Sequence, residues 1–182
     1  MAKITATMIE NLRKQIHGRR VVDLGAGDLA QANWLAANGA AAVTAIDREW
    51  MPAPSSTRIT TLQRHFSDVP TGVMHDAVAF LSWPVNIPAP GLTALLAAAG
   101  EIIYIGHTFD SNMCGTPALW RLLATRQILW HIPASTGSMI CYGIVAPADR
   151  QLLPEEIAGL HQDTMSIQKF HDIYPETEAA CP

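Results

Sequence analysis

Short apolar runs and polar turns alternate along the first 146 residues of the chain. Apolar positions recur every three or four residues over 4–16, which predicts an amphipathic helix that packs on a sheet. The same spacing with stop signals predicts further helices, at 29–38, 88–99, 117–124 and 154–160. Short continuous apolar runs predict buried strands, at 20–24, 43–47, 59–65, 76–81, 101–105, 127–132 and 139–146.

Strands that alternate with helices are typical of a parallel α/β sheet. The last two strands are separated only by the polar turn 135–138, so we expect them to pair as an antiparallel hairpin. The sequence therefore predicts a doubly wound, mainly parallel seven-stranded sheet with a C-terminal antiparallel hairpin and helices on both faces. We expect residues 1–160 to form this single domain and residues 161–182 to form a C-terminal arm or tail.

The first strand runs directly into a glycine turn, Asp23-Leu24-Gly25-Ala26-Gly27-Asp28. Glycine has no Cβ, so the backbone can bend sharply here and a ligand can lie against it. Asp28 is a suitable N-cap for the helix 29–38, and Gly39 is placed to end that helix.

A second acid, Asp47, ends the next strand twenty positions after Gly27. Ligands of open parallel sheets bind at the carboxyl ends of the strands. A carboxylate at that edge can accept hydrogen bonds from both hydroxyls of a ribose. Strand, glycine turn, helix, strand and acid together are half of a nucleotide-binding βαβ unit.

Two classes of cofactor use such a unit. Dinucleotides place a diphosphate on the helix N-terminus. Here Asp23 and Asp28 flank the turn, and two carboxylates would repel a diphosphate. They suit a ligand that carries an ammonium and a sulfonium instead.

At these residues the sequence resembles the class I S-adenosylmethionine-dependent methyltransferases. Their first motif reads acid-x-Gly-x-Gly-x-Gly, with another acid at the end of the second strand, and the matching positions are Asp23, Gly25, Gly27 and Asp47. The third glycine is replaced by Leu29, which the motif tolerates if the helix has already begun.

The resemblance implies S-adenosylmethionine as cofactor. It places Asp23 near the ammonium group, the turn 25–27 against the methionine part and Asp47 on the ribose. It also implies an acid just past the third strand on the adenine amino group, where Asp68 stands; a turn residue before Pro70 is the alternative. The expected cofactor-binding residues are Asp23, Gly25, Ala26, Gly27, Asp47, Arg48 and Asp68.

Ser82-Trp83-Pro84-Val85 follows the fourth strand, where amino-directed methyltransferases carry Asn, Asp or Ser, then Pro-Pro and an aromatic residue. The Ser matches, but Trp and Val replace the first Pro and the aromatic residue. A polar loop after the fifth strand brings His107 near Asp110, a candidate base with its partner, and an unremarkable polar loop is the alternative. The catalytic candidates are Ser82, Trp83, Pro84 and His107.

The amino-acid composition limits the class of protein and the ligands that we expect. Of the 182 residues, 49% are hydrophobic and 15% charged, which is typical of a folded domain, and the net charge of -4 gives no general case for nucleic-acid binding. One basic cluster, most simply a solvated helix face, precedes the first strand: Arg13, Lys14, His17, Arg19 and Arg20. The odd count of three cysteines favours a reducing compartment. We therefore expect a cytoplasmic protein without metal or membrane span.

Two other functions remain open. Leu29 and the partial fourth motif also fit a non-catalytic methyltransferase-like binding or regulatory protein. Ala30 completes Gly-x-Gly-x-x-Ala, a permitted fingerprint of NAD-dependent oxidoreductases. The methyl acceptor is not identified by the sequence. In a nearly minimal chain, either the pocket is open or a partner subunit completes it, and an open pocket suits a large substrate or a homodimer.

Overall fold

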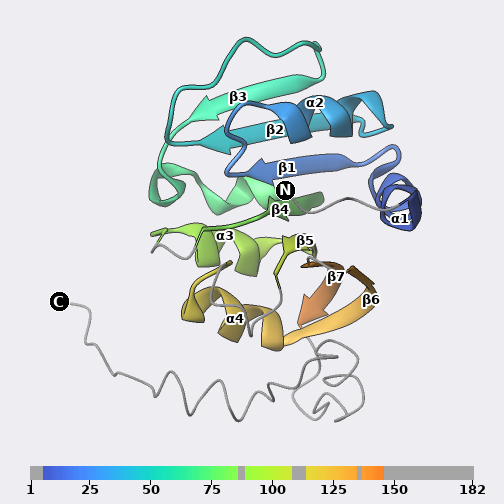
Figure 1. The fold of residues 1–182 in the computed structure, drawn as a ribbon. Coiled ribbons are helices and arrows are strands. Elements are labelled where there is room, and N and C mark those ends of the chain that lie inside the picture. Colours follow the sequence, from blue (N-terminus) through green and yellow to red (C-terminus); the bar gives the residue numbers. More distant parts are fainter. Residues whose placement is uncertain (1–5, 86–88, 108–113, 135–136, 146–182) are drawn as a thin grey trace, which may run out of the picture.

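The computed structural model describes residues 6–85, 89–107, 114–134 and 137–145. These residues form a seven-stranded sheet in the order β3-β2-β1-β4-β5-β7-β6 (Figure 1). The strands are β1 Arg20–Leu24, β2 Ala42–Asp47, β3 Ile59–Gln63, β4 Ala77–Ser82, β5 Glu101–Gly106, β6 Arg126–Ala134 and β7 Gly137–Val145. The helices are α1 Ala6–Ile16, α2 Ala30–Ala37, α3 Leu92–Ala98 and α4 Pro117–Ala124, with 3₁₀ turns η1 Phe66–Asp68 and η2 Thr71–Met74.

Strands β1 to β5 are all parallel, whereas β7 runs antiparallel to both β5 and β6. The predicted mainly parallel sheet with a C-terminal antiparallel hairpin is confirmed. Because β1 to β5 are parallel, their carboxyl ends lie at one edge of the sheet, which we call the carboxyl edge; the opposite side is the amino edge.

The sheet separates two hydrophobic cores, because successive residues of a strand point to opposite faces. On one face, Val21 and Val78 pack with α1 and α2. On the other, Val22 and Leu81 pack with α3, α4 and η2. This alternation explains why the central strands read as continuous apolar runs: both faces are covered.

Two helices begin later than the sequence predicts. Leu29 is not yet helical, since it has a left-handed backbone (φ 65°), and α2 begins at Ala30. The assumption that the helix has already begun at Leu29 is therefore wrong. Similarly, α3 begins at Leu92 because Gly91 is also left-handed (φ 87°). A Cβ on Gly91 would lie 2.3 Å from the backbone nitrogen of Ser67, so only glycine fits there.

No helix joins β2 to β3 in the described residues 48–58, in agreement with the poor helical pattern there. This connection packs on α2 instead, where Asn33 accepts hydrogen bonds from the backbone and side chain of Ser55. The expected helix 154–160, the tail 161–182 and Asp110 lie outside the described residues. In the part of the chain that is described, no helix has the length and apolarity to cross a membrane.

Candidate functional site

The glycine turn after β1 is open on its outer side. Gly25 and Gly27 have φ values of 82° and 49°, which a glycine adopts without strain. A Cβ built on either residue would have no heavy atom within 4 Å. Leu29 does not fill this space either, because its side chain is fully buried in the core beneath α2. The turn therefore leaves room for a ligand against its backbone.

Asp47 is fixed beside this turn by backbone amides. Its Oδ2 accepts a hydrogen bond from the Gly27 N–H at 2.9 Å, and its Oδ1 accepts one from the Glu49 N–H at 2.9 Å. The carboxylate is half-buried and lines a cavity. Each carboxylate oxygen can accept more than one hydrogen bond, so the group keeps capacity for a ligand.

Asp23 lies behind the turn rather than in the cavity. It is 2% exposed, and its Oδ2 has no hydrogen-bond partner among the described residues. Burial, with the negative charge of Asp47 as a second cause, raises the pKa of Asp23 from 3.8 to about 7. At neutral pH this carboxyl is therefore only partly ionised. Asp23 and Asp28 together therefore repel a diphosphate less strongly than two fully ionised carboxylates would.

The cavity at the carboxyl edge has a volume of about 310 Å³, at the lower end of small-molecule sites. It extends over the ends of β1 to β4. The expected site residues that line it are Gly25, Asp47, Arg48, Ser82, Trp83 and Pro84. Residues from three separate sequence motifs thus meet in one cavity.

Five expected site residues do not line this cavity. Asp23 and Ala26 are buried, and Gly27 faces Asp47. Asp68 is exposed in η1, where its Oδ1 accepts a hydrogen bond from the Ser67 hydroxyl at 3.2 Å. His107 stands behind the cavity wall, with its ring 5.0 Å from that of Trp83. Their roles in binding or catalysis stay predictions.

The structure adds residues that the sequence did not single out. Arg64, His65 and Phe66 line the cavity from the end of β3. Ala89 and Pro90 line it from the segment before α3. The predicted strand 59–65 ends at these residues, and that end was the available signal, because the carboxyl ends of all such parallel strands lie at the same edge.

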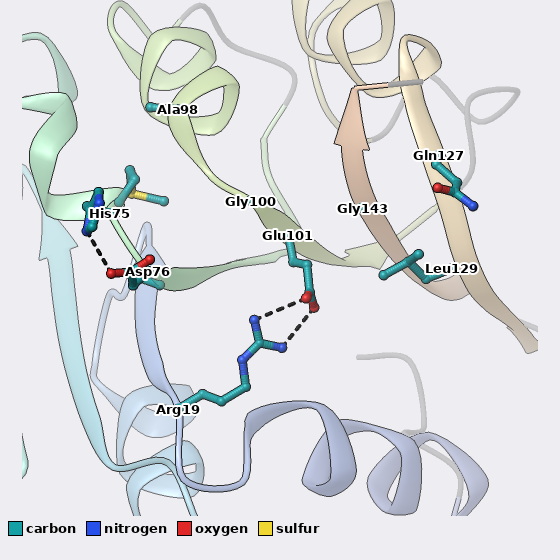
Figure 2. Close-up of a pocket in the computed structure, with 11 residues that line it drawn as sticks. Arg19, His75, Asp76, Ala98, Gly100, Glu101, Gln127, Leu129 and Gly143 are labelled. Carbon is teal, nitrogen blue, oxygen red and sulfur yellow. Dashed lines mark hydrogen bonds and ion pairs between the residues drawn. The ribbon is translucent and has the colours of Figure 1, made fainter. Parts of the chain in front are cut away.

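A larger groove of about 550 Å³ lies at the amino edge (Figure 2). In Figure 2 the guanidinium of Arg19 points to the carboxylate of Glu101, at distances of 2.8 and 3.1 Å. A second pair, the exposed His75 and Asp76, stands across the groove at 2.8 Å. These polar groups pair with one another, and β1, β4 and β5 begin here rather than end. The carboxyl-edge cavity is therefore the candidate site.

The basic cluster before β1 is likewise accounted for by contacts within the protein. Arg13 donates a hydrogen bond to the Asn38 side chain, and Lys14 pairs with Glu10. Arg20 donates to the backbone carbonyl of His75. The simpler interpretation of this cluster, a helix face and a strand entry, agrees with these contacts.

Comparison with known proteins identifies the fold. No protein-family model and no curated protein matches the sequence. Among solved structures, N-methyltransferase NodS from Bradyrhizobium japonicum, in complex with S-adenosyl-L-homocysteine, is 8% identical with a TM-score of 0.55; the match covers 76% of this chain and 84% of that one. A protein from Listeria monocytogenes, proposed to be an S-adenosylmethionine-dependent methyltransferase, is 13% identical with a TM-score of 0.53, over 77% and 96% of the two chains.

A third structure is PH1948 from Pyrococcus horikoshii, proposed to be an RNA methyltransferase. It is 11% identical with a TM-score of 0.53, and the match covers 80% of this chain and 88% of that one. At such low identity these likenesses establish the fold alone. The chain has the class I methyltransferase fold, as the sequence predicts.

Proposed function

We propose that the protein is an S-adenosylmethionine-dependent methyltransferase whose cofactor site is the carboxyl-edge cavity. One observation carries this proposal: Asp47, at the ribose position of the fold, faces the same cavity as Gly25 of the open glycine turn. The partly ionised Asp23 beneath the turn has a carboxyl oxygen with no hydrogen-bond partner among the described residues, which fits a ligand with an ammonium group.

Different residues of the chain would contact different parts of the cofactor. The backbone of the turn 25–27 would lie against the methionine part, and Asp47 would accept hydrogen bonds from the ribose hydroxyls. Bound S-adenosylmethionine supplies a methyl group activated by a sulfonium. The protein's contribution is then to align an acceptor, so the site needs no strong catalytic cluster.

Ser82, Trp83 and Pro84 would line the acceptor side of the cavity, because they lie at the end of β4 and directly after it. The half-buried Trp83 offers an aromatic surface for a planar group. Amino-directed chemistry rests only on the partial match of these residues to the fourth motif. The methyl acceptor, and whether a second copy or a partner subunit completes the open cavity, are left to experiment.

The backbone argues against a dinucleotide cofactor. A diphosphate would need free N–H groups at the turn and at the start of α2. The Gly27 N–H is already donated to Asp47, and the Ala30 N–H is donated to Asp28 at 3.0 Å. An NAD-dependent oxidoreductase is therefore the weaker candidate.

Calorimetric titration with S-adenosylmethionine, S-adenosylhomocysteine and NADH tests the proposal. Micromolar binding of both sulfur ligands without NADH binding is the expected result. Binding of both ligands, with no transfer of radiolabelled methyl groups to any fraction of a cell extract, would favour the non-catalytic alternative. Silence toward both sulfur ligands would overturn the cofactor assignment.

A further inference from the structure

The acceptor-side turn Trp83–Val85 has an unusual backbone. Trp83 has a φ of 52°, in the left-handed region that bulky residues rarely adopt. Such a conformation costs free energy and persists only where the surroundings fix it. Two backbone links do so: the Trp83 N–H donates to Ile105 O at 2.7 Å, and the Gly115 N–H donates to Pro84 O at 2.8 Å as part of an antiparallel bridge between Val85 and Cys114.

The first link is supported from β5. The Tyr104 side chain is fully buried, and its hydroxyl donates a hydrogen bond to the His107 carbonyl at 2.5 Å. The His107 ring in turn meets the Trp83 ring edge-on, at 5.0 Å and 78°. Burial raises the pKa of Tyr104, so its hydroxyl remains a donor at physiological pH.

The backbone at the end of β5 is shaped to allow this contact. A Cβ on Gly106 would lie 2.6 Å from the Tyr104 hydroxyl oxygen. Only glycine at 106 therefore lets the hydroxyl reach the carbonyl of His107. Tyr104 does not line the cavity, so it acts on the turn through the residues that it contacts, His107 and Trp120.

The second link is supported from α4. The indole N–H of Trp120 donates to the Cys114 carbonyl at 3.1 Å, and this residue bridges to Val85. The Trp120 ring also packs edge-on against Tyr104, with centroids 5.2 Å apart. The two aromatic residues thus contact each other behind the turn and hold its two flanking segments.

We propose that Tyr104 and Trp120 are positioning residues, which hold the left-handed Trp83 turn in the geometry that lines the acceptor side of the cavity. The role assigned to these residues rests on the proposed function, whereas the contacts are observed independently of it. Neither residue belongs to the methyltransferase motifs in the sequence. The chain therefore compensates for its partial fourth motif with contacts from β5 and α4.

The substitution Tyr104→Phe tests the proposal, because it removes one hydroxyl and keeps the ring. Tyr142→Phe is the matched control: Tyr142 is also a buried tyrosine with a raised pKa, in the same core, and it does not line the cavity. Hydrogen exchange followed by NMR should show the Trp83 and Gly115 amides exchanging at least about tenfold faster in Tyr104→Phe than in the control.

A second readout follows the ring contact itself. The His107 ring protons should lose part of their ring-current shift from Trp83 in Tyr104→Phe and keep it in Tyr142→Phe. Trp120→Phe should speed exchange at Gly115 more than at Trp83, because it releases the Cys114 side of the turn. If Tyr104→Phe and its control show the same exchange rates and shifts, Tyr104 is a core residue only and the proposal is wrong.

Titration with S-adenosylhomocysteine separates this inference from the proposed function. The ribose contact and the glycine turn lie at the ends of β1 and β2, so Tyr104→Phe should change the dissociation constant by less than about threefold. If the unmodified protein binds no sulfur ligand, the proposed function fails. The exchange and NMR results still decide whether Tyr104 and Trp120 position the turn.

Discussion

At the scale of single residues, Asp47 at the end of β2 combines two properties. Its carboxylate is oriented by two backbone amides, and it still faces a cavity. Such a group is pre-organised, so a ligand does not have to immobilise it on binding.

We expect Asp47→Ala to weaken S-adenosylhomocysteine binding by more than tenfold, a loss of over about 1.4 kcal/mol, because two ribose hydroxyls lose their acceptor. Isothermal titration of the folded variant measures this. Asp76→Asn is the control: Asp76 is an exposed carboxylate at the amino edge, and asparagine tolerates its φ of 55°. Equal affinity in the two variants would contradict the ribose assignment.

Asp23 makes the free energy of unfolding depend on pH. Its pKa is 3.8 in a free chain and about 7 in the folded protein. Below pH 4 the proton is bound in both states, so the fold does not bury a charge at this residue. Between pH 4 and 7 only the unfolded chain ionises, so stability falls as pH rises, by at most a few kcal/mol, on the order of 1.4 per pH unit.

Asp23→Asn should remove this contribution. We expect urea unfolding to show the variant gaining stability relative to the unmodified protein by about 2 kcal/mol or more between pH 4.5 and pH 7.5. The comparison cancels the other titrating groups, which are shared by both proteins. A stability difference that is the same at both pH values would show that Asp23 ionises normally in the fold.

At the scale of elements, the start of α2 shows how Leu29 can replace a glycine of the motif. The residue keeps the left-handed backbone that glycine would adopt, at a cost of about 1–2 kcal/mol. Its side chain is fully buried, and truncating a buried leucine costs about 2–5 kcal/mol. Burial therefore outweighs the backbone cost.

We expect Leu29→Gly to lower the free energy of unfolding by about 1–3 kcal/mol, because relief of the backbone returns only part of the lost burial. Urea unfolding measures the change. The control Ala30→Gly alters an exposed residue of the same turn and should cost no more than about 1 kcal/mol. A Leu29→Gly protein as stable as the unmodified one would mean that the backbone cost is dominant.

The end of α3 depends on one buried arginine. The Arg126 guanidinium donates to the carbonyls of Leu96, Ala97 and Ala99 at 2.7–3.0 Å, and to Gly143 on β7 at 2.9 Å. Burial lowers the pKa of Arg126, but the carbonyls at the helix end favour its positive charge. This residue joins α3 to the C-terminal hairpin.

Arg126→Lys should destabilise the protein by about 3 kcal/mol or more, because one ammonium cannot reach all these carbonyls. The control Arg121→Lys changes an exposed arginine of α4 and should stay within about 0.5 kcal/mol. Both values come from urea unfolding. Equal stability of the two variants would show that the carbonyls are satisfied without the guanidinium.

The sequence predicts the elements well where apolar residues define them. Strand β1 was predicted at its exact bounds and α4 likewise, because their patterns are local. The starts of α2 and α3 were missed because they depend on distant contacts: Leu29 is buried in the core, and Gly91 lies against the backbone at Ser67. Neither of these contacts can be predicted from local helix propensity.

The residues of the candidate site also fall into those that local sequence predicts and those that it does not. The motif residues Gly25 and Asp47 were predicted, and both line the cavity. Arg64 and His65 were not singled out, because the sequence predicts them as the end of the strand 59–65 and polar residues there have no distinctive pattern of their own. The sequence predicts Tyr104 only as part of the apolar strand 101–105. Its contact with His107 depends on the glycine at 106 and on the packing of α4.

At the scale of the whole molecule, the two edges of the sheet differ in kind. At the amino edge, charged side chains such as those of Arg19 and Glu101 form ion pairs with each other. At the carboxyl edge, loops from four successive parallel strands surround one cavity. A parallel sheet produces this difference because the carboxyl ends of all its strands, and the loops that follow them, meet at one edge.

The strand order has a consequence for synthesis on the ribosome. Strand β7 lies between β5 and β6, although it is the last of the seven to be made. A nascent chain that ends before residue 137 therefore exposes one bare side of β5 and has no place for β6. The translated chain must wait for its final hairpin before the sheet can close, and during that interval it is most exposed to aggregation.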